Sequence, residues 1–553
     1  MKNKITILLG KSVLLLGLSF IVSSCDEAFL DEVPKDFLSP VNAYTDLAGF
    51  ETAITTLHSN ARDFWMEADG PGYFILPGLG TDFANYGENF TSGPRMDYSA
   101  LSPTDAYANE QWNRAYKLIK NANTIISRAE SDKAKWKTET EKAQIVAEAR
   151  FFRAWAFKLL ANLFGGVPII EEEITSPKID FVRSTRDEVY HFAKEDLTFA
   201  AANLPETEKA QGRISKAAAN HLLSEINICL KDWQGAIDAA SLVINNPNFK
   251  LMTQRFGRRT SANGDVFWDL FQRGNQNRTS GNKEAIWVIQ VEYKTPGGGD
   301  KDNNGYHSER AWGARYHSIK DPAGKNGFVL SDEMGRPVGW CVLTNYLQQT
   351  IWKSDWNDMR NSAYNIKREF YYNDPTSAYF GKLVSTEVLA QQELRYFQPF
   401  LMKVTTPFDH PDGILNTGRI YRDIYAIRLA ETYLLRAEAY LGKNDKTNAA
   451  ADINVVRARA NAIPVNSADV TIDYILDERA RELVTEEFRT CTLMRLGLLY
   501  DRVKNYSMIL KGDGSVVPST PSTTIQPKNN LWPIPQAAID LNGGAKLEQN
   551  PGY

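Results

Sequence analysis

The sequence is poor in the residues that most often build metal centres, disulfide frameworks and catalytic bases. Its 553 residues include only 4 cysteines and 6 histidines. After Cys25, the thiols of Cys229, Cys341 and Cys491 are scattered, which matches neither a disulfide framework nor a zinc site. No HExxH, GxSxG or P-loop motif occurs. These absences argue against a metalloenzyme or a nucleophilic hydrolase, and we expect no catalytic residue, metal or cofactor.

An excess of charge of one sign is also missing. Lys and Arg number 63 and Asp and Glu number 67, which gives a net charge of −4. No basic stripe stands out, although nucleic-acid-binding domains normally carry one. Beyond residue 24 no long apolar run follows, so we expect no transmembrane helix in the rest of the chain. The sequence therefore predicts a globular protein without a nucleic-acid partner.

The N-terminus carries an export signal. Three lysines precede an almost wholly apolar run over residues 13–22, which is too short to span a bilayer as a permanent helix. The run ends in Ser23 and Ser24, directly before Cys25. This pattern resembles a bacterial lipoprotein signal, with residues 1–24 removed, Cys25 lipidated and residues 25–40 forming a tether to the membrane. The alternative is an ordinary signal peptide with an incidental cysteine.

Helical periodicity dominates most of the remaining chain. Apolar residues recur at 3–4 spacing over 109–130, and 141–166 ends in a Gly-Gly stop. Segments 213–247 and 428–461 each read as two alanine-rich helices joined by a short turn, which resembles a tetratricopeptide unit. We expect a mainly α fold whose helical pairs pack together, because each pair needs neighbours to bury its faces.

Two stretches interrupt this scaffold. Residues 66–106 are punctuated by Gly and Pro, and residues 248–420 are rich in Gly, Asn, Trp and Tyr. Within the second, 284–293 is the one clear strand-like run. We therefore divide the chain into an N-terminal helical part (41–247), an irregular, loop-rich insertion with small β elements (248–420), and C-terminal helices with a tail (421–553).

Aromatic residues make up 11% of the chain, and many lie in loop-like sequence beside Gly, Asn and Asp. A glycan site needs aromatic planes for sugar faces and polar groups for hydroxyls. The stretches GTDFANYGENF (80–90) and YHSERAWGARYHS (306–318) supply both. The candidate ligand-binding residues are Asp82, Tyr86, Trp312, Arg315, Tyr316 and Trp340. The alternative is that these side chains form small cores under long loops, as we expect for Trp268, Phe271 and Trp287, which lie in apolar runs.

Two further patterns invite a functional interpretation. Asp300, Asp302, Asn304 and Gly305 match the start of a calcium loop, but Ala311 occupies the twelfth position, where a bidentate Glu belongs. We therefore expect a solvated turn. The block DERARELVTEEFR (477–489) is dense in carboxylates, as a glycoside hydrolase site would be. Its arginines recur at helical spacing, which favours an ion-paired helix without catalysis.

Several blocks, in order along nearly the whole chain, resemble the SusD/RagB family of Bacteroidetes outer-membrane lipoproteins. They include CDEAFLDEVPKD after the signal, AEARFFRAWAFKLLANLFGGVPII (147–170), RLAETYLLRAEAYLG, ILDERARELVTEEFRTCTLMRLG and LWPIPQAAIDLNGGAKLEQNPGY at the C-terminus. The insertion and the 66–106 loop carry the weakest resemblance.

This resemblance implies a tetratricopeptide-like scaffold with an irregular ligand-binding region. It implies a non-enzymatic lipoprotein, anchored in the outer membrane and facing outward, that binds a glycan and delivers it to a SusC-like TonB-dependent transporter. It also implies that the loop holding Asp82 contributes to the glycan site. The alternatives are a peptide-binding lid of the same transporter class and a tetratricopeptide scaffold for protein partners.

Overall fold

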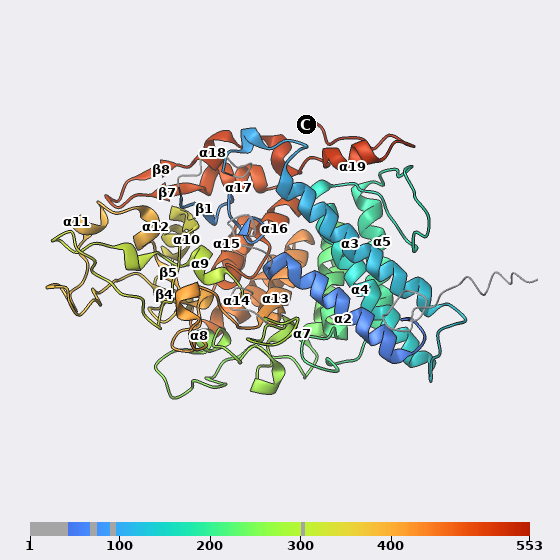
Figure 1. Ribbon diagram of the computed structural model, residues 1–553, viewed down its shortest axis with the longest axis horizontal. Coiled ribbons are helices and arrows are strands. Elements are labelled where there is room, and N and C mark those ends of the chain that lie inside the picture. Colours follow the sequence, from blue (N-terminus) through green and yellow to red (C-terminus); the bar gives the residue numbers. More distant parts are fainter. Residues whose placement is uncertain (1–42, 67–73, 89–95, 300–304) are drawn as a thin grey trace, which may run out of the picture.

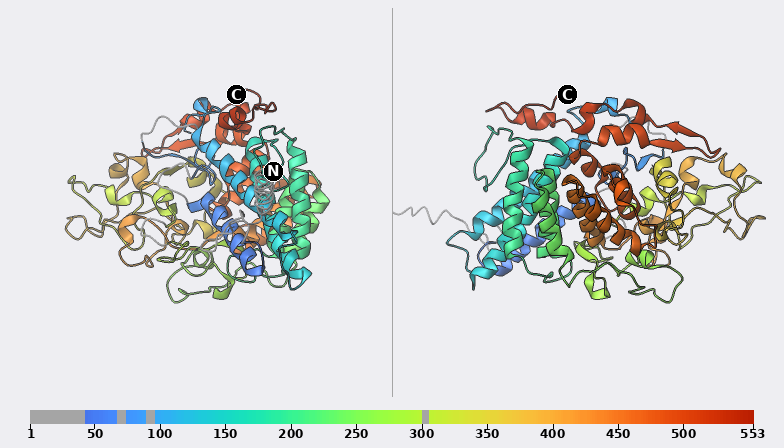
Figure 2. Two further views of the ribbon diagram at one scale, coloured as in Figure 1. Left: turned by 45° about the vertical axis from the view of Figure 1, so that its right-hand side comes forward. Right: turned by 180° about the vertical axis from the view of Figure 1, so that it is seen from behind.

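The computed structural model describes residues 43–66, 74–88, 96–299 and 305–553, and in these the chain is mainly helical (Figure 1). The N-terminal helices lie at one end of the long axis and the insertion at the other, with the C-terminal helices between them (Figure 2). Cys25 and the calcium-like residues Asp300, Asp302 and Asn304 fall outside the described residues. No described helix is both long and apolar enough to cross a membrane.

The described residues of the N-terminal part form six helices, whose ends follow local signals. They are α2 (Leu47–Met66), α3 (Ala106–Ala129), α4 (Glu139–Phe164), α5 (Arg186–Asn203), α6 (Lys216–Cys229) and α7 (Trp233–Ile244). Helix α4 ends at Gly165, whose φ of 75° suits a residue without a β-carbon. Helix α5 begins with a capping box of Thr185 and Glu188, in which two backbone N–H groups at the helix start find side-chain partners.

The two predicted helical pairs are confirmed as α6–α7 and as α13 (Leu429–Gly442) with α14 (Lys446–Arg459). Both turns are built alike. A residue with positive φ, Lys231 or Asn444, precedes an aspartate, Asp232 or Asp445, whose side chain caps the next helix.

The pairs also pack against each other, as expected. One apolar cluster joins α6 and α7 to α13, and its buried residues are Ile228, Ala236, Ile237, Leu435 and Ala439. At the end of α13, a β-carbon on Gly442 would lie 2.5 Å from the Trp233 ring. Glycine therefore permits the close approach of α13 to α7.

The charged block 477–489 differs from the expected single helix. Helix α15 (Ile472–Leu483) ends early, Thr485 has a φ of 69°, and α16 begins at Arg489. The β-branched residues Val484 and Thr485 lie at this break. The remaining C-terminal helices are α16 (Arg489–Arg495), α17 (Leu499–Tyr506), α18 (Thr520–Thr524) and α19 (Gln536–Leu541).

The elements in the described residues of the insertion are all short, as predicted. Its helices are α8 (Val266–Leu270), α9 (Ser308–Trp312), α10 (Asn345–Gln348), α11 (Thr386–Leu389) and α12 (Leu394–Phe397). The described strands form two-stranded antiparallel pairs: β1 (Ala84–Tyr86) with β3 (Cys341–Leu343), β2 (Ala285–Ile289) with β6 (Ile424–Arg428), β4 (Ile366–Lys367) with β5 (Phe400–Leu401), and β7 (Met508–Leu510) with β8 (Val516–Pro518).

The strand predicted at 284–293 is β2, and it carries the aromatic centre of the core. Trp287 is 1% exposed and meets Trp155 of α4 edge-on at 5.6 Å between ring centroids. Trp268 and Phe271 are also buried, so the prediction that all three belong to the core is confirmed. The β2–β6 pair thus ties the insertion to the N-terminal helices.

Candidate functional site

The first of the two stretches singled out in the sequence meets the insertion through the β1–β3 pair. Tyr86 lies opposite Cys341, and the N–H of Gly87 donates to the carbonyl of Trp340 at 2.8 Å. The backbone N–H of Arg315 donates to the carbonyl of Arg395, at 2.7 Å, beside the same strands. Residues more than 200 positions apart therefore share one surface.

Asp82 occupies the interior beneath this surface. It is 0% exposed, and its carboxylate accepts hydrogen bonds from Arg489 at 2.6 and 3.0 Å and from Arg502 at 2.9 Å. Burial opposes ionisation, but the two guanidinium groups outweigh it and lower the pKa of Asp82. Its observed partners make Asp82 an anchor of the 80–86 loop on α16 and α17.

Trp312, Tyr316 and Trp340 also lie in the interior. Trp312 and Tyr316 are 0% exposed, and Trp340 is 7% exposed beneath the guanidinium of Arg310, which stacks 4.9 Å from its ring. The Tyr316 hydroxyl donates to the carbonyl of Gly335 at 2.9 Å and accepts from the Ser331 N–H at 2.7 Å. Burial raises the pKa of Tyr316 to about 12. All three side chains belong to the main apolar core, which they share with the N-terminal and C-terminal helices.

Tyr86 and Arg315 are the two candidates that reach the surface, since both are half-buried. Tyr86 lines a cavity of about 420 Å³ between β1, the 390–394 segment and the β7–β8 hairpin. The guanidinium of Arg315 lies 5.9 Å from the ring of Tyr396, whose hydroxyl hydrogen-bonds the cavity residue Glu393. The cavity lining comprises Asn85, Tyr86, Gly87, Glu88, Val342, Ala390, Gln392, Glu393, Leu394, Ile509, Lys511 and Gly512.

The charged groups here hold one another in place. Arg395 pairs with Glu88 and, at 2.8 Å, with Glu393, which also accepts a 2.7 Å hydrogen bond from the Tyr396 hydroxyl. Burial and the neighbouring Glu88 raise the pKa of Tyr86, so its hydroxyl stays protonated at neutral pH. The site thus presents neutral hydroxyls, fixed carboxylates and guanidinium groups, which can hydrogen-bond a polar ligand without chemical change.

Sequence reasoning missed the residues of segment 392–396. The run QQELRYFQPF interleaves charged and aromatic residues, as the two chosen stretches do. That similarity could have identified segment 392–396 as a candidate from the sequence. Its position opposite Tyr86 is set by the contact of Arg395 with Glu88, which are 307 positions apart.

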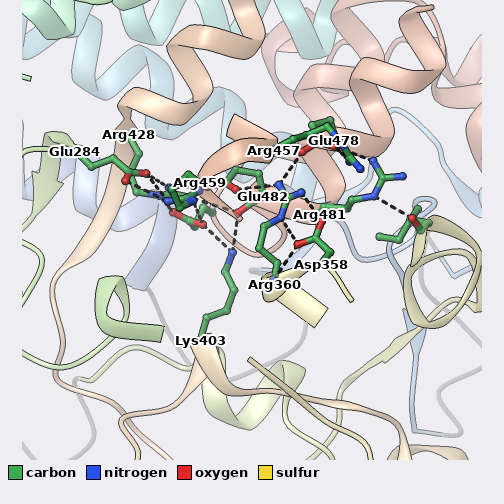
Figure 3. Close-up of polar contacts among 12 residues, drawn as sticks. Glu284, Asp358, Arg360, Lys403, Arg428, Arg457, Arg459, Glu478, Arg481 and Glu482 are labelled. Carbon is green, nitrogen blue, oxygen red and sulfur yellow. Dashed lines mark hydrogen bonds and ion pairs between the residues drawn. The ribbon is translucent and has the colours of Figure 1, made fainter. Parts of the chain in front are cut away.

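A second polar cluster, in the interior, accounts for the carboxylates of 477–489 (Figure 3). Glu478 pairs with Arg360, Arg457 and Arg481, each at 2.8 Å. Although burial acts in the opposite direction, these guanidinium groups lower the pKa of Glu478 to about 2. A general acid needs a raised pKa, so the lowered pKa of Glu478 does not suit that role. The cluster is ion-paired, as the sequence predicted, and it is buried.

Glu482, one helical turn further along α15, completes this cluster. It pairs with Arg428 at 2.9 Å, with Arg360 at 3.1 Å and with Arg459. Among the described residues, no group of three or more His, Cys, Asp or Glu side chains is arranged to hold a metal ion.

Comparisons with known proteins point in one direction. A family model described as "SusD family" matches residues 283–553, and one described as "Starch-binding associating with outer membrane" matches residues 80–228. The chain is 24% identical to SusD-like protein P25 of Formosa agariphila, over 95% of each chain. It is 25% identical to the starch-binding protein SusD of Bacteroides thetaiotaomicron, over 76% of this chain and 75% of that protein.

A solved structure shares the fold. It is surface glycan-binding protein A from Bacteroides thetaiotaomicron in complex with laminarihexaose. The TM-score is 0.67 at 19% identity, over 92% of this chain and 100% of that chain.

Proposed function

Because the chain belongs to the SusD family, we propose that it binds an oligosaccharide or polysaccharide at the surface around Tyr86, Arg315 and Tyr396. Support comes from the relatives, which include a starch-binding protein and a fold neighbour crystallised with laminarihexaose. Within the chain, the observation that carries the proposal is the convergence of these side chains beside a cavity of about 420 Å³.

The chemistry of the site suits a sugar. Tyrosine rings offer planes for the C–H faces of a pyranose, and Glu88, Gln392 and Glu393 offer partners for its hydroxyls. Since Arg395 pairs with both carboxylates, they are oriented before a ligand arrives. Such preorganisation favours affinity because less side-chain freedom is lost on binding.

In the cell, the proposed role is capture and delivery. Lipidation of Cys25 would anchor the protein in the outer membrane, facing outward, where it would pass its ligand to a SusC-like TonB-dependent transporter. The outer-membrane association in the description of the second family model supports this location. The protein would perform no chemistry on the glycan.

The test is calorimetry or affinity electrophoresis of residues 26–553 against plant, host and microbial polysaccharides. Tyr86→Ala and Tyr396→Ala should each weaken a detected interaction by about 1–3 kcal/mol, because each removes a ring and a hydroxyl from the site. Tyr371→Ala is the matched control, since Tyr371 is a 49% exposed tyrosine elsewhere in the insertion.

Equal binding by all three variants would reject this surface as the glycan site. No binding across the panel would reject the glycan and direct the search to peptides or to the assembled transporter.

A further inference from the structure

A second cavity, remote in sequence from the proposed glycan site, lies between α3, the 168–181 segment and the C-terminal tail. Its volume is about 420 Å³. Residues 537–547, at and beyond α19, close one wall, and the tail is held there because the Asn542 side chain hydrogen-bonds both the N–H and the carbonyl of Phe181, each at 2.8 Å. In Figure 1, α19 lies above the upper ends of α3 and α5. The cavity is therefore formed by three segments that are held together in the folded chain.

Most of the cavity wall is apolar. Trp112 and Tyr116 lie one turn apart on α3, with ring centroids 4.9 Å apart, and Phe181 faces the same space. The other apolar lining residues are Pro168, Ile170, Ala537, Ala538, Leu541 and Leu547. A cavity of this size and character fits an apolar group of a small ligand.

The apolar surface continues outside the cavity. Leu541 is 77% exposed, and Ile179 and Val182 on the facing segment are 55% and 67% exposed. Exposed apolar side chains gathered around a cavity mark interaction sites more often than single exposed ones do.

The polar groups of the cavity are few. The Tyr116 hydroxyl already donates to the carbonyl of Pro168 at 2.8 Å, and the Asn542 side chain is bonded to Phe181. The side-chain amides of Asn109 and Asn113 are one turn apart on α3, and neither makes a side-chain hydrogen bond to any other described residue. Lys178 is the one charged residue of the lining, and its side chain is 50% exposed. Its ammonium group forms a long ion pair with Asp180 at 3.9 Å and lies 5.6 Å from the ring centroid of Phe181, which lines the cavity. The cavity thus combines an apolar interior with a positive charge and two free amides.

We propose that this cavity binds an apolar group that carries a carboxylate. The apolar part occupies the space beside Trp112, Tyr116 and Phe181, and the carboxylate meets the ammonium group of Lys178. A free N-acylated apolar amino acid and the C-terminal residue of a peptide share this chemistry. The inference does not depend on the proposed glycan site, which uses other residues.

The test is ligand-observed NMR on residues 26–553 with N-acetyl-phenylalanine, its amide, and the tripeptide Gly-Gly-Phe. We expect the acid to bind about threefold to fivefold more tightly than the amide, because one partly exposed charge pair adds a modest amount. Lys178→Gln should remove this difference, and Ala538→Trp, which fills the cavity, should abolish binding of both. Lys511→Gln, at the other cavity, is the matched control.

Each outcome decides the proposal. Equal binding of acid and amide, or binding that persists in an Ala538→Trp variant with an unchanged melting curve, overturns it. No binding of any probe at millimolar concentration also overturns it.

Binding of the tripeptide at least as tight as that of the free acid identifies a peptide end as the source, and tighter binding of the free acid identifies a small molecule. Glycan binding should be unchanged in Lys178→Gln and in Ala538→Trp. A failure of this proposal is therefore distinguishable from a failure of the proposed glycan function.

Discussion

At the scale of single residues, Asp82 shows that a local sequence pattern does not decide whether a side chain is exposed. It sits among Gly, Phe, Asn and Tyr, as a ligand-binding acid would, yet its carboxylate faces Arg489 and Arg502, 407 and 420 positions away. A buried carboxylate requires such partners, because an isolated buried charge is too costly. Tyr86, four residues on, has a similar sequence environment and reaches the surface.

Asp82 is therefore expected to contribute to stability. Asp82→Asn would remove the counter-charge that two buried guanidinium groups share, although Arg489 keeps Glu487 and Arg502 keeps Asp473 and Asp477. Because these partners remain, we expect a loss of about 1–3 kcal/mol in the free energy of unfolding. Urea denaturation followed by circular dichroism measures it. Asp132→Asn, at an exposed acid, should stay within about 0.5 kcal/mol of the wild type. A similarly small change for Asp82→Asn would contradict the structural role.

At the scale of elements, helices were easier to predict than the chain between them. Some features depend only on residues that are close together in the sequence, so their positions can be predicted from it. They are the capping box at Thr185, the helix end at Gly165 and the apolar faces of the helices. The break after Leu483 was missed because helical spacing of charges continues through it, while Thr485 adopts a positive φ. The packing of the two helical pairs was expected from the sequence. The short distance between α13 and α7 was not, and it depends on Gly442.

Gly442 gives the prediction at this scale. Gly442→Leu would place a side chain against the Trp233 ring, where even a β-carbon lies at 2.5 Å. We expect a net loss of about 1–3 kcal/mol, because overpacking outweighs the better helix propensity of leucine. Thermal and urea unfolding measure the change.

The control is Gly543→Leu, because a β-carbon there meets nothing within 4 Å. It should change the stability by less than about 0.5 kcal/mol. If the two variants were equally stable, the packing of α13 against α7 would not depend on this glycine.

At the scale of the whole molecule, buried carboxylates link distant parts of the fold. Glu148 on α4, Glu225 on α6 and Glu478 on α15 are buried, and burial alone would raise their pKa values. Facing basic side chains reverse this: His58 and Arg213 for Glu148, Lys158 and Arg495 for Glu225, and Arg360, Arg481 and Arg457 for Glu478. The pKa of each falls from 4.5 to about 2.

These shifts predict unfolding by acid. A carboxyl whose pKa is lowered by folding stabilises the protein above its unfolded pKa and loses that contribution as the pH falls through the folded pKa. Each contributes on the order of 3 kcal/mol, by the free energy of a pKa unit. These three carboxyls should keep their full contribution from pH 7 to 5 and lose it between about pH 4.5 and 2, so stability should fall steeply over the lower range. Urea midpoints measured across this range test it, and a midpoint at pH 3 equal to that at pH 7 would refute it.

The sequence by itself determined the mainly helical scaffold, the two helical pairs, the strand at β2 and the aromatic core around Trp287. Each of these depends on periodicity, capping or apolar runs, which act over a few residues. Only the tertiary structure decided which candidate side chains reach the surface. Asp82, Trp312, Tyr316 and Trp340 became interior while Tyr86 and Arg315 stayed accessible, and Tyr396 joined them. The physical reason is that burial and ion pairing in a loop-rich insertion are set by contacts between segments hundreds of residues apart, which no local pattern records.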